Sequence, residues 1–222
     1  MKVLLLVNGY ASSVTARSRV LIQSIIAENH DVQLALTSRR GHASRLARGA
    51  ASTGTEIVFV LGGDGTLNEA ANGLAGSDCA LAPLPGGSTN VFARTLGIPD
   101  APLEAVRSLL SAIDTNQIRS VGLGEVGGRY FLFHCGMGFD AAVVQQVERK
   151  AALKRYAGHP LFIWAGFNTW LNHYDRSSPK MSAKHGDKFI NDSYFTVGLN
   201  TNPYTYLGHR PLSLAPAATL EN

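Results

Sequence analysis

Cysteine is scarce in this sequence of 222 residues, which contains only Cys79 and Cys135. Both lie in apolar stretches and they form no CxxC pair, so the sequence excludes a disulfide framework and offers no zinc-binding pattern. A chain without disulfides suits a reducing compartment. We therefore expect a cytoplasmic protein in which the two cysteines are small buried side chains.

Long hydrophobic runs are also absent. The first apolar run, at residues 3–7, ends at Asn8-Gly9 and is too short for the apolar region of a signal peptide. No stretch approaches the roughly 18 uncharged apolar residues that a membrane-spanning helix needs. Hydrophobic residues make up 45% of the chain and charged residues 16%, which excludes disorder and favours a globular core. We expect any membrane contact to be peripheral, at the inner face of the membrane.

Negative charge is rare in the first quarter of the chain. Residues 1–55 contain seven Lys and Arg residues but only Glu28 and Asp31, a net charge of +5, whereas the whole chain has +4. Such a bias suits a phosphate-bearing ligand, such as a nucleotide, a lipid headgroup or a nucleic acid. It is equally typical of a solvated basic face that binds nothing.

Strand and helix patterns alternate along the first half of the chain. Short apolar, β-branched runs predict strands, and apolar residues at helical spacing predict the helices between them. The strands are expected at residues 2–7, 32–37, 57–61 and 80–84, and the helices at 15–29, 42–53, 67–75 and 103–112. This order predicts an α/β fold with a parallel sheet between helices. The loops after the strands would then share the carboxyl edge of the sheet, where ligands bind.

The pattern changes near residue 120, where we place a domain boundary. Residues 1–120 are expected to form a nucleotide-binding α/β domain, and residues 121–222 a second, β-rich domain. In the second domain, antiparallel strands are expected at residues 118–125 with 129–134, and at 180–185 with 188–199, and helices at 141–155 and 161–172.

The junction of the third strand and third helix reads Leu61-Gly62-Gly63-Asp64-Gly65-Thr66-Leu67-Asn68-Glu69. Glycines at such a junction let backbone N–H groups approach an anion closely, and the helix N-terminus attracts the same charge. Asp64 would repel a bare phosphate, so it suits a metal bound to phosphates, a donor that it orients, or a hydroxyl whose proton it takes. A tight turn with Asp64 capping the helix explains the pattern equally well.

A second loop of the same character, Pro85-Gly86-Gly87-Ser88-Thr89-Asn90, follows the next strand. Ser88 either caps a helix that begins near Asn90 or binds a phosphate oxygen. Two other nucleotide motifs are excluded. Residues 122–127 match GxGxxG but precede a predicted strand rather than a helix, and the sequence contains no GxxxxGK[ST].

Together these segments resemble the diacylglycerol kinase catalytic domain, a family that includes bacterial lipid kinases and the sphingosine and ceramide kinases. Residues 62–69, with Asn72-Gly73-Leu74, are similar to its GGDGT-x-NE signature. Residues 85–94 are similar to its P-x-G-T-x-N-x-x-A-R segment, with Ser88 in place of the usual threonine, and residues 136–141 match a third block. The resemblance implies a first domain like that of NAD kinases and phosphofructokinases, and a mainly antiparallel β domain, with ATP between them.

The resemblance also implies roles for single residues. Asp64 is expected to be indispensable for catalysis, and Asn90 and Arg94 are expected to support the loop. ATP and Mg²⁺ are the implied cofactors, without identified metal ligands. The family's early N-P-x-[SA]-G turn is altered here to Asn8-Gly9-Tyr10-Ala11-Ser12. The residues expected to contact the nucleotide are Thr37, Gly63, Asp64, Gly65, Thr66, Leu67, Asn68, Glu69 and Ser88.

The implied activity is ATP-dependent phosphorylation of a lipid hydroxyl, with diacylglycerol as the expected acceptor, no nucleic-acid partner, and a homo-oligomer as an open alternative. A sphingosine-type kinase, an NAD kinase and a nucleotide-binding domain without turnover are the other candidates. Residues 214–222 resemble a family block inside which the sequence stops. We therefore expect an incomplete β domain, a general base beyond residue 222, and ATP binding without efficient transfer by residues 1–222 alone.

One apolar stretch bears on membrane contact. Residues 161–172 are rich in apolar side chains and follow four basic residues between positions 149 and 155, a combination found in helices that lie on anionic bilayers. The helical spacing of Ile163, Phe167 and Trp170 is more typical of core packing. We favour the core interpretation and keep peripheral membrane contact as the alternative.

Overall fold

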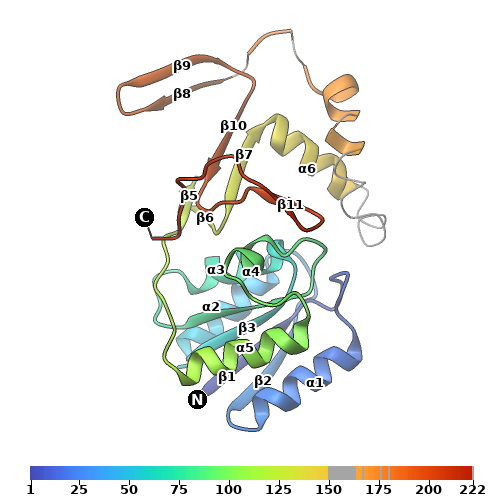
Figure 1. Ribbon diagram of the computed structural model, residues 1–222, viewed down its shortest axis with the longest axis vertical. Helices are drawn as coiled ribbons and strands as arrows, with labels where there is room; N and C mark the ends of the chain where they lie inside the picture. The colour runs from blue at the N-terminus through green and yellow to red at the C-terminus, as the bar shows by residue number, and fades with distance from the viewer. Residues whose placement is uncertain (150–163, 167, 176, 180, 222) are drawn as a thin grey trace. The chain divides into compact units, whose positions relative to one another are not determined.

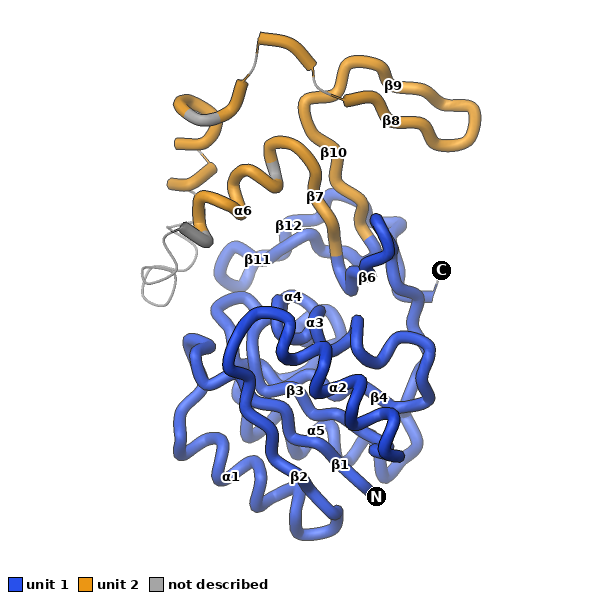
Figure 2. Tube along the Cα trace, turned by 180° about the vertical axis from the view of Figure 1, so that it is seen from behind, with its two compact units in different colours: residues 1–133, 200–222 blue, residues 134–199 orange. Residues whose placement is uncertain are grey.

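The protein is described from a computed structural model that covers residues 1–149, 164–166, 168–175, 177–179 and 181–221. It contains two compact units, one of residues 1–133 with 200–222 and one of residues 134–199 (Figure 2). The first unit contains the parallel sheet and all the predicted site loops. These units are defined by contacts within the structure and do not test the predicted domain boundary at residue 120, which stays a prediction.

A four-stranded parallel sheet forms the centre of the first unit. It consists of β1 (Lys2–Val7), β2 (Asp31–Leu36), β3 (Ile57–Gly62) and β4 (Ala80–Pro85), in the order β2-β1-β3-β4. Every residue of β3 is buried, because this strand lies inside the sheet with helices on both faces. The predicted parallel α/β fold is confirmed.

Helices cover both faces of this sheet (Figure 1). On one face, α1 (Ala16–Ala27) and α5 (Pro102–Asp114) bury side chains such as Ile22 and Val106 against β1 and β3. On the other face lie α2 (His42–Ser52) and α3 (Asp64–Leu74). These two helices pack so closely that a Cβ on Gly73 would collide with the carbonyl oxygen of Ser44. Helix α3 is thereby held tightly against its neighbour.

Helix α3 begins earlier than the sequence predicts. Gly63 is its N-cap, and Asp64, Gly65 and Thr66 form its first turn rather than a loop. The expected start at residue 67 is therefore wrong. Glycine lowers helix propensity, which conceals the true start in the sequence. The consequence is that the signature lies on the N-terminal turn of a helix.

Two short hairpins complete the first unit. Strands β5 (Gly124–Val126) and β6 (Arg129–Phe131) pair as predicted but are shorter than expected, and the motif at residues 122–127 leads into strands rather than a helix. The predicted strand context of this motif is confirmed. Strands β11 (Thr205–Leu207) and β12 (Arg210–Leu212) form a hairpin that the sequence analysis did not predict.

The second unit contains antiparallel strands and helical segments. Strand β7 (His134–Gly138) pairs with β10 (Phe195–Leu199), and β8 (Met181–His185) pairs with β9 (Lys188–Ser193). The expected strand at 188–199 is thus divided into β9 and β10, and His134 begins β7 instead of ending the preceding hairpin. Helix α6 (Phe139–Arg149) forms the first part of the helix expected at 141–155. The rest of that prediction lies outside the described residues.

The apolar stretch at 161–172 is only partly described, because Ile163 and Phe167 lie outside the described residues. Ala165 and Thr169 are buried, whereas Trp170, in the π-helical turn η1 (Thr169–His173), is 40% exposed and packs edge-on against Phe139. The described residues do not decide between core packing and membrane contact for residues 161–172, and both stay predictions. Across the part of the chain that the structure describes, no helix is both long and apolar enough to cross a bilayer.

The two cysteines are free thiols that are only partly buried, so the expectation that they are buried holds only in part. Burial raises the pKa of the Cys79 thiol above its ordinary value. This keeps the thiol uncharged at neutral pH and poorly nucleophilic. Cys79 directly precedes β4, at the amino edge of the sheet. It therefore takes no part in the site at the carboxyl edge.

Candidate functional site

Two glycine loops at the carboxyl edge of the sheet are in direct backbone contact. Gly62 is the last residue of β3 and Gly63 follows it, whereas Gly86 and Gly87 directly follow β4. The Gly86 N–H donates to the Gly62 carbonyl oxygen at 2.9 Å. A Cβ on Gly87 would lie 2.7 Å from the Cα of Gly63, and one on Gly86 would lie 2.9 Å from the Gly62 nitrogen. Close approach, rather than a positive φ, requires glycine at this contact.

The loop after β1 joins these two loops. Asn8 Nδ2 donates to Thr66 Oγ1 at 2.9 Å, and the Ser13 N–H donates to the Gly86 carbonyl oxygen at 3.0 Å. The loops after β1, β3 and β4 therefore converge, as the parallel sheet predicts. Sequence reasoning placed Asn8 in the altered family turn but gave its side chain no role in the site. An asparagine directly after a buried strand on this edge was the available signal.

Asp64 caps a neighbouring helix. Its Oδ2 accepts a hydrogen bond from the Val91 N–H at 3.0 Å, and its Oδ1 accepts one from the Phe92 N–H at 3.2 Å. These amides begin α4 (Val91–Thr95), whose N-cap Asn90 makes no side-chain cap bond. A carboxylate is favourable at a helix N-terminus. The alternatives in which Asp64 caps its own helix or Ser88 caps α4 are therefore wrong.

Glu69 makes the equivalent contact with α2. Its Oε1 accepts from the Gly41 N–H at 2.8 Å, and its Oε2 accepts from the Ala43 N–H at 3.3 Å. The N-cap of α2 is Gly41, which has no side chain to cap the helix. Both acids of the signature thus cap helices other than their own. Helix α3 itself starts at Gly63 without a side-chain cap.

Two asparagines of α3 bind the backbone of the segment at β6. Asn68 Oδ1 accepts from the Leu132 N–H at 2.9 Å, and Asn68 Nδ2 donates to the Tyr130 carbonyl oxygen at 3.2 Å. Asn72 accepts from the Tyr130 N–H at 2.9 Å and donates to the Tyr130 carbonyl oxygen at 2.8 Å. The amide of Asn68 is therefore engaged with protein backbone. Its contact with a nucleotide stays a prediction.

Of the remaining predicted residues, Leu67 lies in the core, and Thr37, Gly65 and Ser88 lie at the carboxyl edge of the sheet. Leu67 is 4% exposed and packs in the core against the sheet, so its side chain lies beneath the site. Thr37 directly follows β2, and its N–H donates to the Val7 carbonyl oxygen at 2.9 Å. Ser88 is exposed in the second glycine loop, and Gly65 has no protein atom within 4 Å of where a Cβ would be. Their nucleotide contacts stay predictions.

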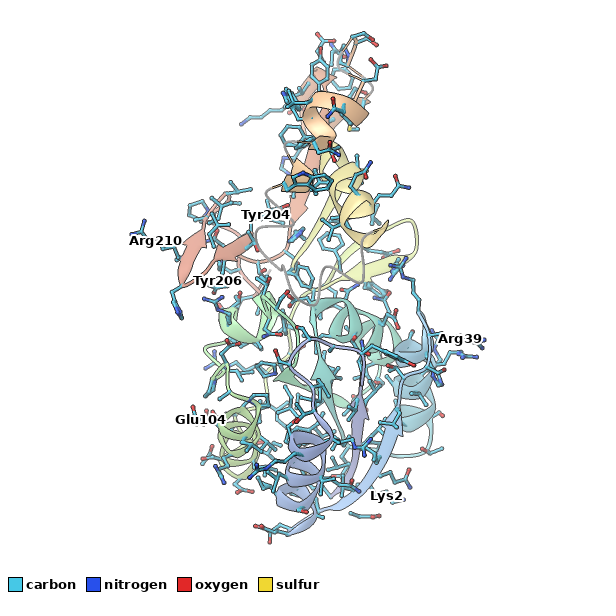
Figure 3. The ribbon with its side chains drawn as sticks, turned by 90° about the vertical axis from the view of Figure 1, so that its right-hand side faces the viewer. Lys2, Arg39, Glu104, Tyr204, Tyr206 and Arg210 are labelled. Carbon is cyan, nitrogen blue, oxygen red and sulfur yellow. The ribbon has the colours of Figure 1, made fainter. Side chains whose placement is uncertain are left out.

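Asn90 and Arg94 occupy the segment that follows the second glycine loop. The buried Asn90, at φ 51°, accepts from the Gly87 N–H at 2.8 Å and donates to the Gly87 carbonyl oxygen at 3.1 Å. The Arg94 guanidinium stacks over the Tyr206 ring at 3.7 Å from its centroid, and Figure 3 labels Tyr206 on its hairpin. Asn90 thus closes the loop on itself, and Arg94 joins α4 to β11.

The resulting site is a small pocket lined in part by Gly63, Asp64, Asn90 and Ala93. Within the described residues, no three His, Cys, Asp or Glu side chains come together in a way that could hold a metal ion. Most of the residues that line the pocket are apolar, and Gly62, Gly63, Asp64 and Asn90 supply its polar groups. The backbone donors of the glycine loops and the N-terminus of α3 suit a phosphorylated ligand that brings its own cation.

The family model for the diacylglycerol kinase catalytic domain matches residues 2–126, which include every loop of this pocket. The chain belongs to the diacylglycerol kinase catalytic domain family. The predicted family resemblance is confirmed.

Individual relatives agree with this assignment. The chain is 33% identical over 188 residues to the probable lipid kinase YegS-like of Pseudomonas fluorescens, covering 84% of this chain and 58% of the relative. It is 34% identical over 133 residues to the diacylglycerol kinase of Bacillus subtilis, covering 59% of this chain and 43% of the relative. The chain thus spans about half the length of these curated relatives.

A solved structure also shares the fold. The crystal structure of a diacylglycerol kinase from Bacillus anthracis matches with a TM-score of 0.69 and 25% identity, over 99% of this chain and 71% of the other. The match extends over both compact units. The predicted combination of a parallel α/β part and antiparallel strands is therefore common to this chain and that protein.

Proposed function

We propose that the protein is a lipid kinase that transfers the γ-phosphoryl group of ATP to the hydroxyl of diacylglycerol. One observation carries the proposal: two glycine loops meet the N-terminus of α3 at the carboxyl edge of a parallel sheet, in a member of the diacylglycerol kinase catalytic domain family. The relatives named as lipid or diacylglycerol kinases support a lipid acceptor.

The phosphates of ATP would bind to backbone donors. The first turn of α3 starts without a side-chain cap, and the helix dipole favours negative charge there. Gly65 has no neighbouring protein atom where a side chain would be, which allows a phosphate oxygen to approach the backbone. Phosphoryl transfer depends mainly on positioning and on neutralising charge, so these donors would supply much of the catalysis.

Asp64 has two tasks in this proposal. Its hydrogen bonds to Val91 and Phe92 fix α4 and with it the second glycine loop. Its charge makes it the residue that would hold Mg²⁺, which in phosphoryl-transfer sites needs only one or two carboxylates together with substrate phosphates. Asp64 lies in the first turn of α3, where the phosphates are proposed to bind, so its carboxylate fits this cation. When bound, Mg²⁺ neutralises charge on the phosphates.

The test is an acceptor panel. The protein, extended to the length of its family relatives, would be incubated with ATP labelled at the γ-phosphate, Mg²⁺ and micelles containing diacylglycerol, ceramide or sphingosine, and separately with NAD. We expect label in phosphatidic acid. Label only in the sphingosine product or only in NADP would contradict the proposed acceptor. ATP binding without label in any acceptor would favour a nucleotide-binding domain without turnover.

A further inference from the structure

We infer that Glu69 is a positioning residue that sets the affinity for ATP through residues 37–43 and does not touch the nucleotide. The inference rests on the proposed function. Glu69 lies on α3, five residues after Asp64, and its carboxylate accepts hydrogen bonds from Gly41 at 2.8 Å and Ala43 at 3.3 Å. Because both oxygens are engaged by backbone, Glu69 acts on the segment that leads into α2.

Helix α2 depends on this carboxylate for its N-terminal cap. Its N-cap Gly41 has a left-handed φ of 76° and no side-chain cap bond. A side-chain oxygen normally satisfies the first amides of a helix, and a negative charge there is favourable. Glu69 supplies both from a residue 28 positions away from Gly41 in the sequence. The start of α2 is thereby attached to the helix that begins at the glycine loop.

The attached segment carries positive charge to the site edge. Neither glycine loop, at residues 61–69 or 85–90, contains a Lys or Arg, whereas Arg39 and Arg40 lie between Thr37 and Gly41. Thr37 directly follows β2, so the segment starts at the carboxyl edge that bears the pocket. Arg39 is exposed and extends away from the body of the protein in Figure 3. Fixing this segment therefore holds Thr37, the predicted nucleotide contact, in place.

A purely structural role predicts a different outcome from a positioning role. Loss of a cap alone would lower the free energy of unfolding and leave the affinity of the folded protein for ATP unchanged. Loss of positioning would also loosen residues 37–43 and weaken ATP binding, with little effect on kcat once ATP saturates. The local flexibility of the segment and the ATP affinity therefore separate the two roles.

The experiment compares Glu69→Ala and Glu69→Gln with a matched control, Glu56→Ala. Glu56 Oε1 also accepts a backbone hydrogen bond, from the Lys2 N–H at 2.9 Å, but at the amino edge of the same sheet. One readout is the rate of trypsin cleavage after Arg39 and Arg40 without ligand, followed by mass spectrometry. The other is the Kd for ATP, with kcat toward diacylglycerol measured at saturating ATP.

For Glu69→Ala we expect cleavage at this segment and the Kd for ATP each to rise about tenfold, the factor that corresponds to one net hydrogen bond to a charged group. Glu69→Gln keeps one acceptor oxygen and the volume of the side chain, so it should raise the cleavage rate and the Kd by less. It replaces Glu69→Ala in the test if the alanine variant does not fold. Glu56→Ala should match the wild type in both. Faster cleavage with an unchanged Kd, or no change in either, would overturn the inference but not the kinase proposal. A wild-type protein that binds no ATP would overturn both.

Discussion

Gly87 lies so close to Gly63 that a Cβ on Gly87 would be 2.7 Å from the Cα of Gly63. This contact joins the ends of β3 and β4, and the Gly86–Gly62 hydrogen bond lies beside it. The two loops therefore behave as one unit, in which a side chain in either would displace the other. The glycines of the site therefore have two separable roles: some allow the two loops to pack together, and Gly65 is proposed to let a ligand approach the backbone.

The first prediction concerns the packing role. Gly87→Ala should lower the free energy of unfolding by about 1–3 kcal/mol, because the added methyl group forces two backbones apart. Gly49→Ala is the control, since a Cβ at Gly49 in α2 meets no atom outside its own stretch of helix within 4 Å; it should raise stability by about 1 kcal/mol or less, because alanine favours a helix. Urea unfolding measures both. A Gly87→Ala protein as stable as the wild type would show that the loops adapt easily.

The second prediction concerns the ligand-facing role. Gly65 does not have a positive φ, and a Cβ there meets no atom outside its own stretch of helix within 4 Å. Gly65→Val should therefore unfold like Gly49→Val, within about 0.5 kcal/mol. It should nevertheless bind a fluorescent ATP analogue about tenfold more weakly, because the side chain blocks approach to the backbone. Equal affinity in the two variants would place the phosphates elsewhere.

The third prediction separates the two tasks of Asp64. Asp64→Asn should lower kcat/KM for lipid phosphorylation by about two orders of magnitude or more. The measurement uses the protein extended to the length of its family relatives. It should also cost about 1–3 kcal/mol of stability, since an amide offers one acceptor to the N–H groups of Val91 and Phe92. Asp78→Asn, at an exposed position before β4, is the control for charge. Turnover close to that of the control would remove Asp64 from catalysis.

The fourth prediction concerns the asparagines of α3. Asn68→Ala and Asn72→Ala should each destabilise the fold by about 1–3 kcal/mol, because backbone groups of Tyr130 and Leu132 lose their partners. Both amides donate to the Tyr130 carbonyl oxygen, so each single variant leaves that oxygen one donor and the double variant leaves it neither; the double variant should therefore lose more than the sum of the two. Full additivity in urea unfolding would argue that the two contacts are independent.

The sheet and the meeting of the loops could be predicted from the sequence because their signals are local. Runs such as residues 57–61 are short, apolar and β-branched, which predicts a buried strand, and parallel strands place their following loops at one edge. The two glycine loops could therefore be located, and their nearness follows from the parallel order. Their direct backbone contact could not, since it depends on the register of β3 and β4.

The contacts of the polar site residues could not be predicted, because their partners are far away in the sequence. Asp64 bonds to amides 27 and 28 residues away, and Glu69 to amides 28 and 26 residues away. Local rules assign a capping residue to its own helix, which is why capping of a helix near Asn90 was one of the two alternatives for Ser88. Only the folded arrangement brings α2 and α4 to the acids of α3.

The most direct test of the phosphate site follows backbone amides in ¹⁵N-labelled protein by NMR as ATP and Mg²⁺ are added. Binding at the N-terminus of α3 predicts saturable shifts of the Gly65, Thr66 and Ser88 amides, while the amides of Glu56 and Ala80 at the opposite edge of the sheet stay in place. The Gly65→Val protein should need about tenfold more ATP to reach the same shifts of the Thr66 and Ser88 amides. Shifts confined to other parts of the chain, or no shifts at millimolar ATP, would contradict the account.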